Sequence, residues 1–237
     1  MTTAGQKVAV ITGASQGIGA GLVDAYRKLG YGVVATSRTI APSADPEVLA
    51  VQGDIADPAT AERVIAAGIE RFGRIDTLVN NAGVFIAKPF TEYTSADYEA
   101  VNGVNLTGFF RITQLAVEQM LAQGTGHVVQ ITTSLVDHAS SDVTSVLASL
   151  TKGGLQSATK ALAIEYAGRG IRSNAVALGI VKTPMHPEAY HETLAAMHPL
   201  GRMGEVGDVT EAVIYLEGAS FVTGEILHVD GGQSAGH

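Results

Sequence analysis

The chain has 237 residues, a formal net charge of −8 and no cysteine, and 46% of its residues are hydrophobic against 16% charged. This composition is typical of a folded globular protein, and it excludes disulfides, thiolate metal ligands and a cysteine nucleophile. The acidic balance, without any basic run, argues against a nucleic-acid partner. Residues 1–6 lack the apolar core of a signal peptide and no run approaches membrane-spanning length, so we expect a cytoplasmic protein without a membrane partner.

The start of the chain has the pattern of a strand, a glycine turn and a helix. An apolar run over residues 7–12 leads into T-G-A-S-Q-G-I-G over residues 12–19, and a helical pattern follows. Gly13 allows a tight turn, Gly17 allows the backbone to approach a ligand closely, and Gly19 allows the helix to pack against the strand. The pattern predicts a dinucleotide site with its pyrophosphate at the helix N-terminus, and an ordinary strand–helix turn is the alternative.

The second strand, over residues 32–36, ends in Ser37-Arg38. An acidic side chain at this place would accept a hydrogen bond from a ribose 2′-hydroxyl, whereas Ser-Arg can bind a 2′-phosphate and so favours NADP. The alternative is an arginine that is merely solvated on a loop. Residues 39–47 contain two prolines and are too few for a crossover helix, which predicts an open adenosine end of the site.

Two further strands end in polar residues. Residues 48–52 form the third predicted strand, and Asp54 just after it could face the adenine or could be a turn residue. A helix is predicted over 58–72, with Pro58 in its first turn. Residues 77–79 form the fourth strand and lead into N-N-A-G over residues 80–83, at the edge where open α/β sheets bind ligands.

A long helix is predicted from Thr94 to residue 123, with Gly124 as its stop. Asn105 lies inside this helix, so its amide needs a core hydrogen bond, an ordered water or a site to satisfy it. The fifth strand, over residues 126–131, ends in Thr132-Thr133-Ser134.

The remainder of the chain continues the alternation of helix and strand. The predicted elements are an apolar helix over residues 149–166, a strand over 172–177, an insert with a helical middle over 184–199, a helix over 205–217 and a strand over 225–229. The histidines at 186, 191 and 198 are irregularly spaced, so we expect them on a substrate lid or a solvated surface and predict no metal site. Asp137-His138 we interpret as a loop and not as part of a triad. Together the elements predict a single α/β domain over residues 1–237, with a doubly wound, Rossmann-like sheet of seven parallel strands.

With these motifs in order, the chain resembles the short-chain dehydrogenase/reductase family over essentially its whole length. The resemblance rests on the glycine turn, N-N-A-G, the N-L-T-G at Asn105, I-T-T-S, the Lys152 helix, and the segments R-S-N-A-V-A-L-G-I-V-K-T and F-V-T-G-E-I-L-H-V-D-G-G. It implies hydride transfer between a nicotinamide cofactor and a carbonyl or alcohol. In the family a serine positions the substrate oxygen, a tyrosine transfers the proton, a lysine holds the ribose, and a helix asparagine holds a water of the proton relay.

The resemblance assigns roles to particular residues. Asn105 matches the relay asparagine, Lys152 the lysine, and Thr183 the residue that binds the nicotinamide amide. Ser134 is our choice for the serine, with Thr133 as the alternative. The cofactor-binding residues that the motifs and the resemblance predict are Gly13, Ser15, Gln16, Gly17, Ile18, Gly19, Ser37, Arg38, Asp54, Ile55, Asn81, Ala82, Gly83, Lys152, Gly179, Ile180 and Thr183.

The chain departs from the family pattern at the tyrosine. The family spacing is Y-x-x-x-K, and four residues before Lys152 stands Ala148. A smaller departure is Leu178, where the family usually has proline. The first departure leaves two hypotheses. One is an NADP(H)-dependent oxidoreductase with an atypical proton donor, acting on a small organic substrate with a C=O, C=N or activated C=C bond. The other is a non-catalytic NADP(H)-binding sensor or scaffold.

The strongly apolar helix over 149–166, together with the resemblance, predicts a homodimer or homotetramer.

Overall fold

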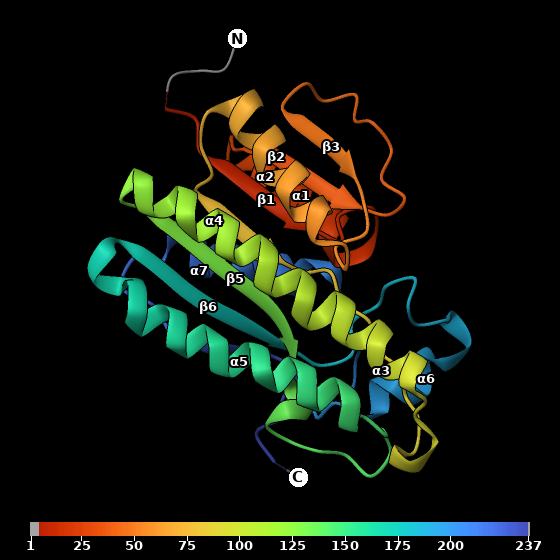
Figure 1. Cartoon of the computed structure of the whole chain (residues 1–237). Coiled ribbons are helices and arrows are strands. Elements are labelled where there is room, and N and C mark those ends of the chain that lie inside the picture. Colours follow the sequence, from red (N-terminus) through yellow and green to blue (C-terminus); the bar gives the residue numbers. More distant parts are fainter. Residues whose placement is uncertain (1–4, 237) are drawn as a thin grey trace.

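Seven parallel strands form the centre of the molecule in the computed structural model, which describes residues 5–236. The strands follow the order β3-β2-β1-β4-β5-β6-β7 across the sheet (Figure 1). Their bounds are β1 Val8–Thr12, β2 Gly32–Ser37, β3 Val48–Gln52, β4 Thr77–Asn80, β5 Gly126–Thr133, β6 Ile171–Leu178 and β7 Ile226–Val229. The central strands are buried on both faces, which is why they read as continuous runs of Val, Ile and Ala. The predicted doubly wound sheet is confirmed.

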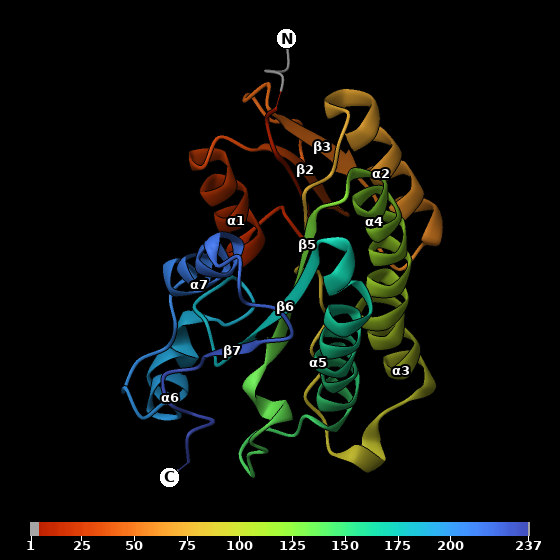
Figure 2. The ribbon, with the colours of Figure 1, turned by 90° about the vertical axis from the view of Figure 1, so that its left-hand side faces the viewer.

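Helices cover both faces of this sheet (Figure 2). One layer contains α1 and α7, and the other contains α2, α4 and α5, with α3 preceding α4. The helices are α1 Gly17–Lys28, α2 Pro58–Phe72, α3 Ser95–Asn102, α4 Phe109–Gln123, α5 Val146–Tyr166, α6 His191–Ala196 and α7 Val206–Gly218. The α5 helix begins three residues before its predicted start, and this extension places Ala148 in its first turn.

The long helix predicted from Thr94 to residue 123 is interrupted by a π-helical segment. A capping box between Thr94 and Asp97 starts α3, and Gly124 with φ of +73° ends α4. Between them, Gly103–Gly108 forms a π-helix that contains Asn105. Such segments are rare and often lie at functional sites, and the buried Asn105 side chain bonds to the loop after β4 and to α5.

The connection from β2 to β3 contains no helix, as its two prolines predict. Arg27 of α1 and Asp45 of this connection form an ion pair, with 2.8 Å between Nε and Oδ2. Residues 184–199 contain a short 3-10 turn and α6, so the predicted helical content is present and the function of the segment as a lid stays a prediction. Among residues 5–236, no helix is long and apolar enough to cross a membrane.

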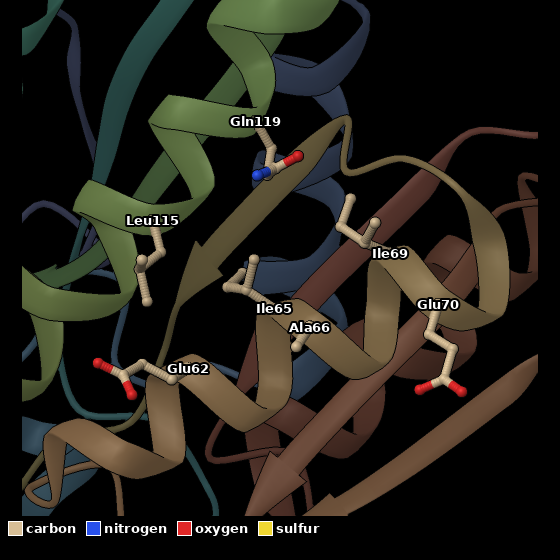
Figure 3. A pocket seen from close by; sticks show the side chains of 7 residues that line it. All are labelled: Glu62, Ile65, Ala66, Ile69, Glu70, Leu115 and Gln119. Atoms are coloured by element: carbon tan, nitrogen blue, oxygen red, sulfur yellow. The ribbon is translucent and has the colours of Figure 1, made fainter.

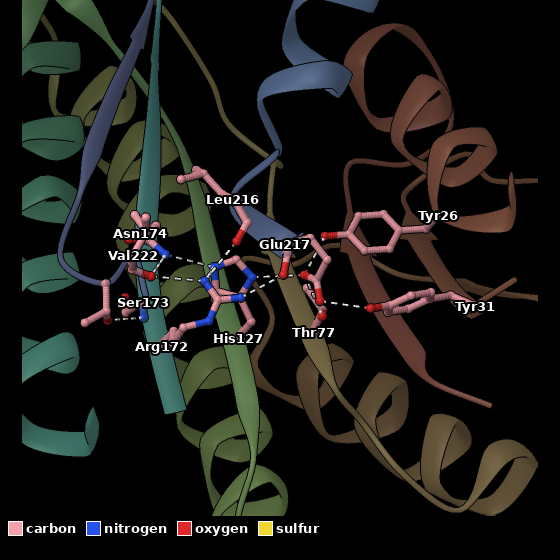
Figure 4. Close-up of polar contacts among 11 residues, drawn as sticks. Tyr26, Tyr31, Thr77, His127, Arg172, Ser173, Asn174, Leu216, Glu217 and Val222 are labelled. Carbon is pink, nitrogen blue, oxygen red and sulfur yellow. Dashed lines mark hydrogen bonds and ion pairs between the residues drawn. The ribbon is translucent and has the colours of Figure 1, made fainter. Parts of the chain in front are cut away.

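A buried polar cluster ties α7 to the amino ends of the strands (Figure 4). The Glu217 carboxylate accepts hydrogen bonds from four donors on other elements: Tyr26 Oη at 3.2 Å, Tyr31 Oη at 2.9 Å, Thr77 Oγ1 at 3.0 Å and His127 Nδ1 at 2.9 Å. Burial raises the pKa of Glu217, but the hydrogen bond and charge interaction with His127 and the hydrogen bonds from Tyr31 and Thr77 outweigh it and bring the pKa to about 2. The Glu217 carboxylate is therefore ionised at neutral pH, and the Arg172 guanidinium of the same cluster carries the opposite charge.

Candidate functional site

A cavity of about 860 Å³ lies at the carboxyl ends of the strands. Residues that follow β1, β2, β3, β4 and β6 line it, together with the end of β5 and the first turns of α5. The strand order reverses between β1 and β4, and open α/β sheets bind their ligands beside such a reversal.

Neighbouring atoms pack so closely around the glycine turn that it has no room for side chains at Gly13 and Gly19. A Cβ on Gly13, whose φ is +65°, would lie 2.9 Å from Asn81 Nδ2, and one on Gly19 would lie 2.1 Å from the Gly13 carbonyl oxygen. A Cβ on Gly17, whose φ is +53°, would lie 3.2 Å from Thr183 Cγ2, and both residues line the cavity. These glycines leave room for backbone to approach a ligand, as the sequence pattern predicts.

The N-N-A-G segment holds this turn in place. The Asn81 side chain donates to the carbonyl oxygens of Thr12 and Gly13 at 2.9 and 3.2 Å, and the backbone N–H groups of Asn81 and Ala82 donate to Thr12 Oγ1. The residue before α1, Gln16, makes no side-chain hydrogen bond to the helix. The first N–H groups of α1 therefore lack a side-chain cap at the glycine turn and can bind an anion.

Arg38 lies at the end of β2 with its guanidinium available. It is exposed and lines the cavity, and no hydrogen bond or ion pair joins this guanidinium to the described residues. The neighbouring Thr36 is buried at the same edge, and its Oγ1 has no partner within residues 5–236. A free cation beside the glycine turn fits an adenosine ribose that carries a phosphate.

Lys152 lies on α5 with its ammonium in the cavity wall. Its Nζ donates to the carbonyl oxygen of Ile131 at 2.7 Å, and a Cβ on Gly83 would lie 2.9 Å from this nitrogen. Burial lowers the pKa of Lys152 to about 8. Gly83 thus leaves the room that the lysine requires.

Asn105 does not line the cavity. Its Oδ1 accepts from the backbone N–H of Val84 at 2.8 Å, and its Nδ2 donates to the Val84 carbonyl and to Thr151 Oγ1, each at 3.1 Å. The side chain therefore joins the loop after β4 to α5, one residue before Lys152. Its place in a proton relay stays a prediction.

Thr133 and Ser134 point in different directions at the end of β5. Thr133 is extended and lines the cavity, whereas Ser134 is buried outside the cavity lining. The Ser134 hydroxyl contacts the Leu178 carbonyl at 3.2 Å and Gln233 Oε1 at 2.9 Å. The geometry favours Thr133, the alternative in the sequence interpretation, as the hydroxyl that can reach a ligand.

Ala148 lines the cavity one turn before Lys152, and apolar side chains form much of the wall beyond it. These are Phe85, Leu135, Val143, Met185 and Leu194. All the residues predicted to bind the cofactor line the same cavity: Gly13, Ser15, Gln16, Gly17, Ile18, Gly19, Ser37, Arg38, Asp54, Ile55, Asn81, Ala82, Gly83, Lys152, Gly179, Ile180 and Thr183. Their roles in binding stay predictions.

The sequence analysis did not identify Gln233, which lines the cavity from the C-terminal loop. His186, which it places on a substrate lid or a solvated surface, lines the cavity from the segment after β6. The two glycines before Gln233 both have positive φ, so G-G was a signal for a turn that brings the next side chain back to the sheet.

A second hollow, of about 430 Å³, lies between α2 and α4 and shares no residue with the large cavity (Figure 3). Its wall is mostly aliphatic, with Ile65, Ile69 and Leu115 (Figure 3), and we assign it no function. Within residues 5–236, no three His, Asp or Glu side chains gather in a group that could hold a metal ion.

Comparisons with known proteins agree with this site. A family model described as enoyl-(acyl carrier protein) reductase matches residues 13–234. A 3-oxoacyl-(acyl-carrier-protein) reductase, FabG, of Thermotoga maritima is 34% identical, over 95% of this chain and 97% of its own. The structure of ElxO with NADP bound superposes with a TM-score of 0.90 at 29% identity, covering 98% of this chain and 100% of its own. The structure of a 3-ketoacyl-(acyl-carrier-protein) reductase from Brucella melitensis complexed with NADH superposes with a TM-score of 0.89 at 30% identity, covering 96% of this chain and 98% of its own. With its motifs in one cavity and these relatives over nearly its full length, the chain belongs to the short-chain dehydrogenase/reductase family of oxidoreductases.

Proposed function

We propose that the protein is an NADP(H)-dependent oxidoreductase that reduces or oxidises a small organic substrate without a tyrosine as proton donor. The observation that carries the proposal is the single cavity, which joins the glycine turn and Arg38 to Thr133, Ala148 and Lys152. A dinucleotide and a small substrate can share such a cavity. The substrate carries a C=O, C=N or activated C=C bond.

The adenosine end of the cavity supports NADP over NAD. Arg38 is available for a charge-assisted contact with a 2′-phosphate, and Ser37 stands where an NAD-binding protein has an acidic residue. The uncapped start of α1 suits the pyrophosphate. The ElxO relative solved with NADP bound supports the same choice.

At the reacting end of the cavity, we propose roles for three residues. NADPH, when bound, supplies the hydride. With the cofactor bound, the Lys152 ammonium would donate to the nicotinamide ribose, and Thr183, which packs close to Gly17, would hold the carboxamide end. The Thr133 hydroxyl holds the substrate oxygen or nitrogen in place.

The proton takes a different route because Ala148 has no acidic group. The space that a tyrosine ring would fill is bounded by the Ala148 methyl and has Lys152 one turn away. In our proposal a water in this space, backed by the Lys152 ammonium, delivers the proton. Substrates that need little acid assistance, such as a protonated C=N or an activated C=C bond, suit this arrangement best.

The proposal is tested by mixing the protein with NADPH and a panel that contains a plain ketone, an activated ketone, a cyclic imine and an activated alkene. We expect consumption of NADPH with at least one imine, alkene or activated ketone, and slow consumption with the plain ketone. Tight NADPH binding without consumption across the panel would contradict catalysis. That outcome would favour the alternative, a non-catalytic NADP(H)-binding sensor or scaffold, which the absence of a tyrosine at Ala148 also supports.

We further infer a homodimer or homotetramer. The outer faces of α4 and α5 carry large apolar side chains that are exposed to solvent in the monomer. Phe110 is 64%, Leu150 63% and Ile164 85% exposed. Large exposed apolar side chains gathered on two adjacent helices are typical of a surface that a partner covers. Sedimentation of the purified protein distinguishes a monomer from either oligomer.

A further inference from the structure

The His198 side chain lies buried between two segments that line the cavity, only 4% exposed. On one side, its Nδ1 lies 3.0 Å from the Leu194 carbonyl oxygen of α6. On the other side, the backbone N–H of Ile180 donates to its Nε2 at 2.9 Å. A carbonyl only accepts and an amide N–H only donates, so the ring is neutral and carries its proton on Nδ1.

The loop after β6 is shaped around this ring. A Cβ on Gly179 would lie 2.7 Å from His198 Nε2, so no side chain fits at position 179. Gly231 in the loop after β7 packs on the other side, where a Cβ would lie 3.2 Å from the Cβ of His198. Three segments that are far apart in the sequence therefore meet at this one imidazole.

Other hydrogen bonds fix the residues around the ring. The N–H of Leu200 donates to the Gly231 carbonyl at 3.1 Å, and Gln233 Nε2 donates to the Met197 carbonyl at 3.4 Å. The backbone of Asp230 also lies close to Gly179, and the Asp230 carboxylate accepts from the N–H groups of Gly232 and Ser234. His198 is thus held in place, and its two bonds connect α6 to the cavity loop.

We propose that His198 is a positioning residue for the cofactor, because its Nε2 fixes the Gly179–Ile180 backbone against the dinucleotide. Both ends of the bridge reach the ligand space, since Leu194, Gly179 and Ile180 all line the cavity. The two hydrogen bonds of the ring therefore join the 184–199 segment to the cofactor loop. This inference rests on the proposed NADP site and is independent of the hydride-transfer chemistry.

Two substitutions separate the two bonds of the ring. The amide of glutamine reaches the position of Nε2, so His198→Gln retains an acceptor for the Ile180 N–H and loses the bond to Leu194. The amide of asparagine reaches the position of Nδ1, so His198→Asn retains the Leu194 bond and leaves the Ile180 N–H unsatisfied. A buried donor without a partner is the costlier loss, so we expect His198→Asn to weaken NADPH binding by about 5- to 100-fold and His198→Gln to retain most of the affinity.

The measurement is a fluorescence titration of NADPH against each variant, with the thermal unfolding of the cofactor-free proteins recorded beside it. His191→Gln is the matched control, because His191 Nε2 bonds only to the His186 carbonyl within the same segment, and its affinity should be unchanged. A purely structural histidine would lower thermal stability and NADPH affinity in parallel, with Asn and Gln alike, and would overturn the proposal.

Hydrogen exchange on the unmutated protein tests the coupling without any substitution. We expect NADPH to slow exchange in residues 179–183 and in residues 194–200 together, and protection of the first segment alone would overturn the proposal. If the unmutated protein fails to bind NADPH, the proposed cofactor site is wrong and the inference falls with it. Equal losses in the two His198 variants, with normal binding by the unmutated protein, would overturn only the role of His198.

Discussion

Ala148 and Lys152 lie one helical turn apart on α5, and both line the cavity that begins at the glycine turn. The lysine that holds the ribose in the family is therefore present at its expected place, while the proton donor one turn before it is replaced by a methyl group. Cofactor binding and proton transfer depend on different residues here, so they can be tested one at a time.

Arg38→Ala should weaken NADPH binding by about 1.5–3 kcal/mol, the range for a hydrogen bond to a charged group, and leave NADH binding nearly unchanged. The reason is that only NADPH carries the 2′-phosphate that the free guanidinium can bind. Parallel fluorescence titrations with the two cofactors measure the difference. Arg111→Ala is the control, because Arg111 does not line the cavity and pairs with Glu62. Equal affinity of the unmutated protein for NADPH and NADH would contradict the assignment.

Lys152→Met should weaken NADPH binding and remove a pH dependence. Burial lowers the pKa of Lys152 to about 8, so its ammonium is present below that pH and is lost as the pH rises through it. NADPH affinity of the unmutated protein should therefore fall as the pH rises through about 8, and that of Lys152→Met should be low and flat. Titrations at several pH values, with the exposed Lys160→Met as control, measure both. A cofactor affinity that Lys152→Met leaves intact would refute the ribose contact.

Thr133→Ala and Ser134→Ala separate the two neighbouring hydroxyls. Thr133 lines the cavity, so its removal should lower kcat with little effect on stability. Ser134 bonds to Gln233 in the interior, so its removal should cost about 0.5–1.5 kcal/mol of stability and change kcat less. Steady-state kinetics and urea unfolding of both variants decide between them, and the reverse pattern would restore Ser134 as the positioning residue.

Much of the fold was predictable because its signals are local. Apolar runs, glycine turns and helix caps each depend on a few adjacent residues, and all seven strands are present where the sequence places them. The sequence could not decide in the same way whether Thr133 or Ser134 directs its hydroxyl into the cavity. Adjacent residues of an extended strand face opposite sides, so an uncertainty of one position exchanges a cavity hydroxyl for a buried one.

Residues whose position depends on long-range contacts were beyond sequence reasoning. His198 reads as one of several irregular histidines, and only the meeting of α6 with the loops after β6 and β7 buries it. Glu217 reads as an ordinary helix-end glutamate, yet it accepts hydrogen bonds from donors as distant in sequence as Tyr26. Such contacts arise from the topology of the whole sheet and leave no periodic pattern.

Glu217→Gln should lower the free energy of unfolding by about 3 kcal/mol at pH 7, since a pKa lowered from 4.5 to about 2 corresponds to a difference of that size. The folded-state pKa is the lower one, so this contribution is complete above about pH 4.5 and is lost as the pH falls toward 2. The gap between the two proteins in urea unfolding should therefore shrink at acid pH. Glu211→Gln, exposed on the same helix, should change stability by less than about 0.5 kcal/mol. A gap that stays constant from pH 7 to pH 3 would contradict the role of the Glu217 charge.

The most direct test of the missing proton donor is the rate at which Ala148→Tyr reduces a small activated ketone with NADPH. A positioned general acid contributes ~10²–10⁴ in rate, so the unmutated protein should turn over plain ketones far below the ~10 s⁻¹ of a typical enzyme. Restoring the hydroxyl should raise turnover of the activated ketone by at least about tenfold while NADPH affinity stays unchanged. Fast reduction of simple ketones by the unmutated protein, unaffected by Ala148→Tyr, would show that another residue is the acid and would contradict the proposal.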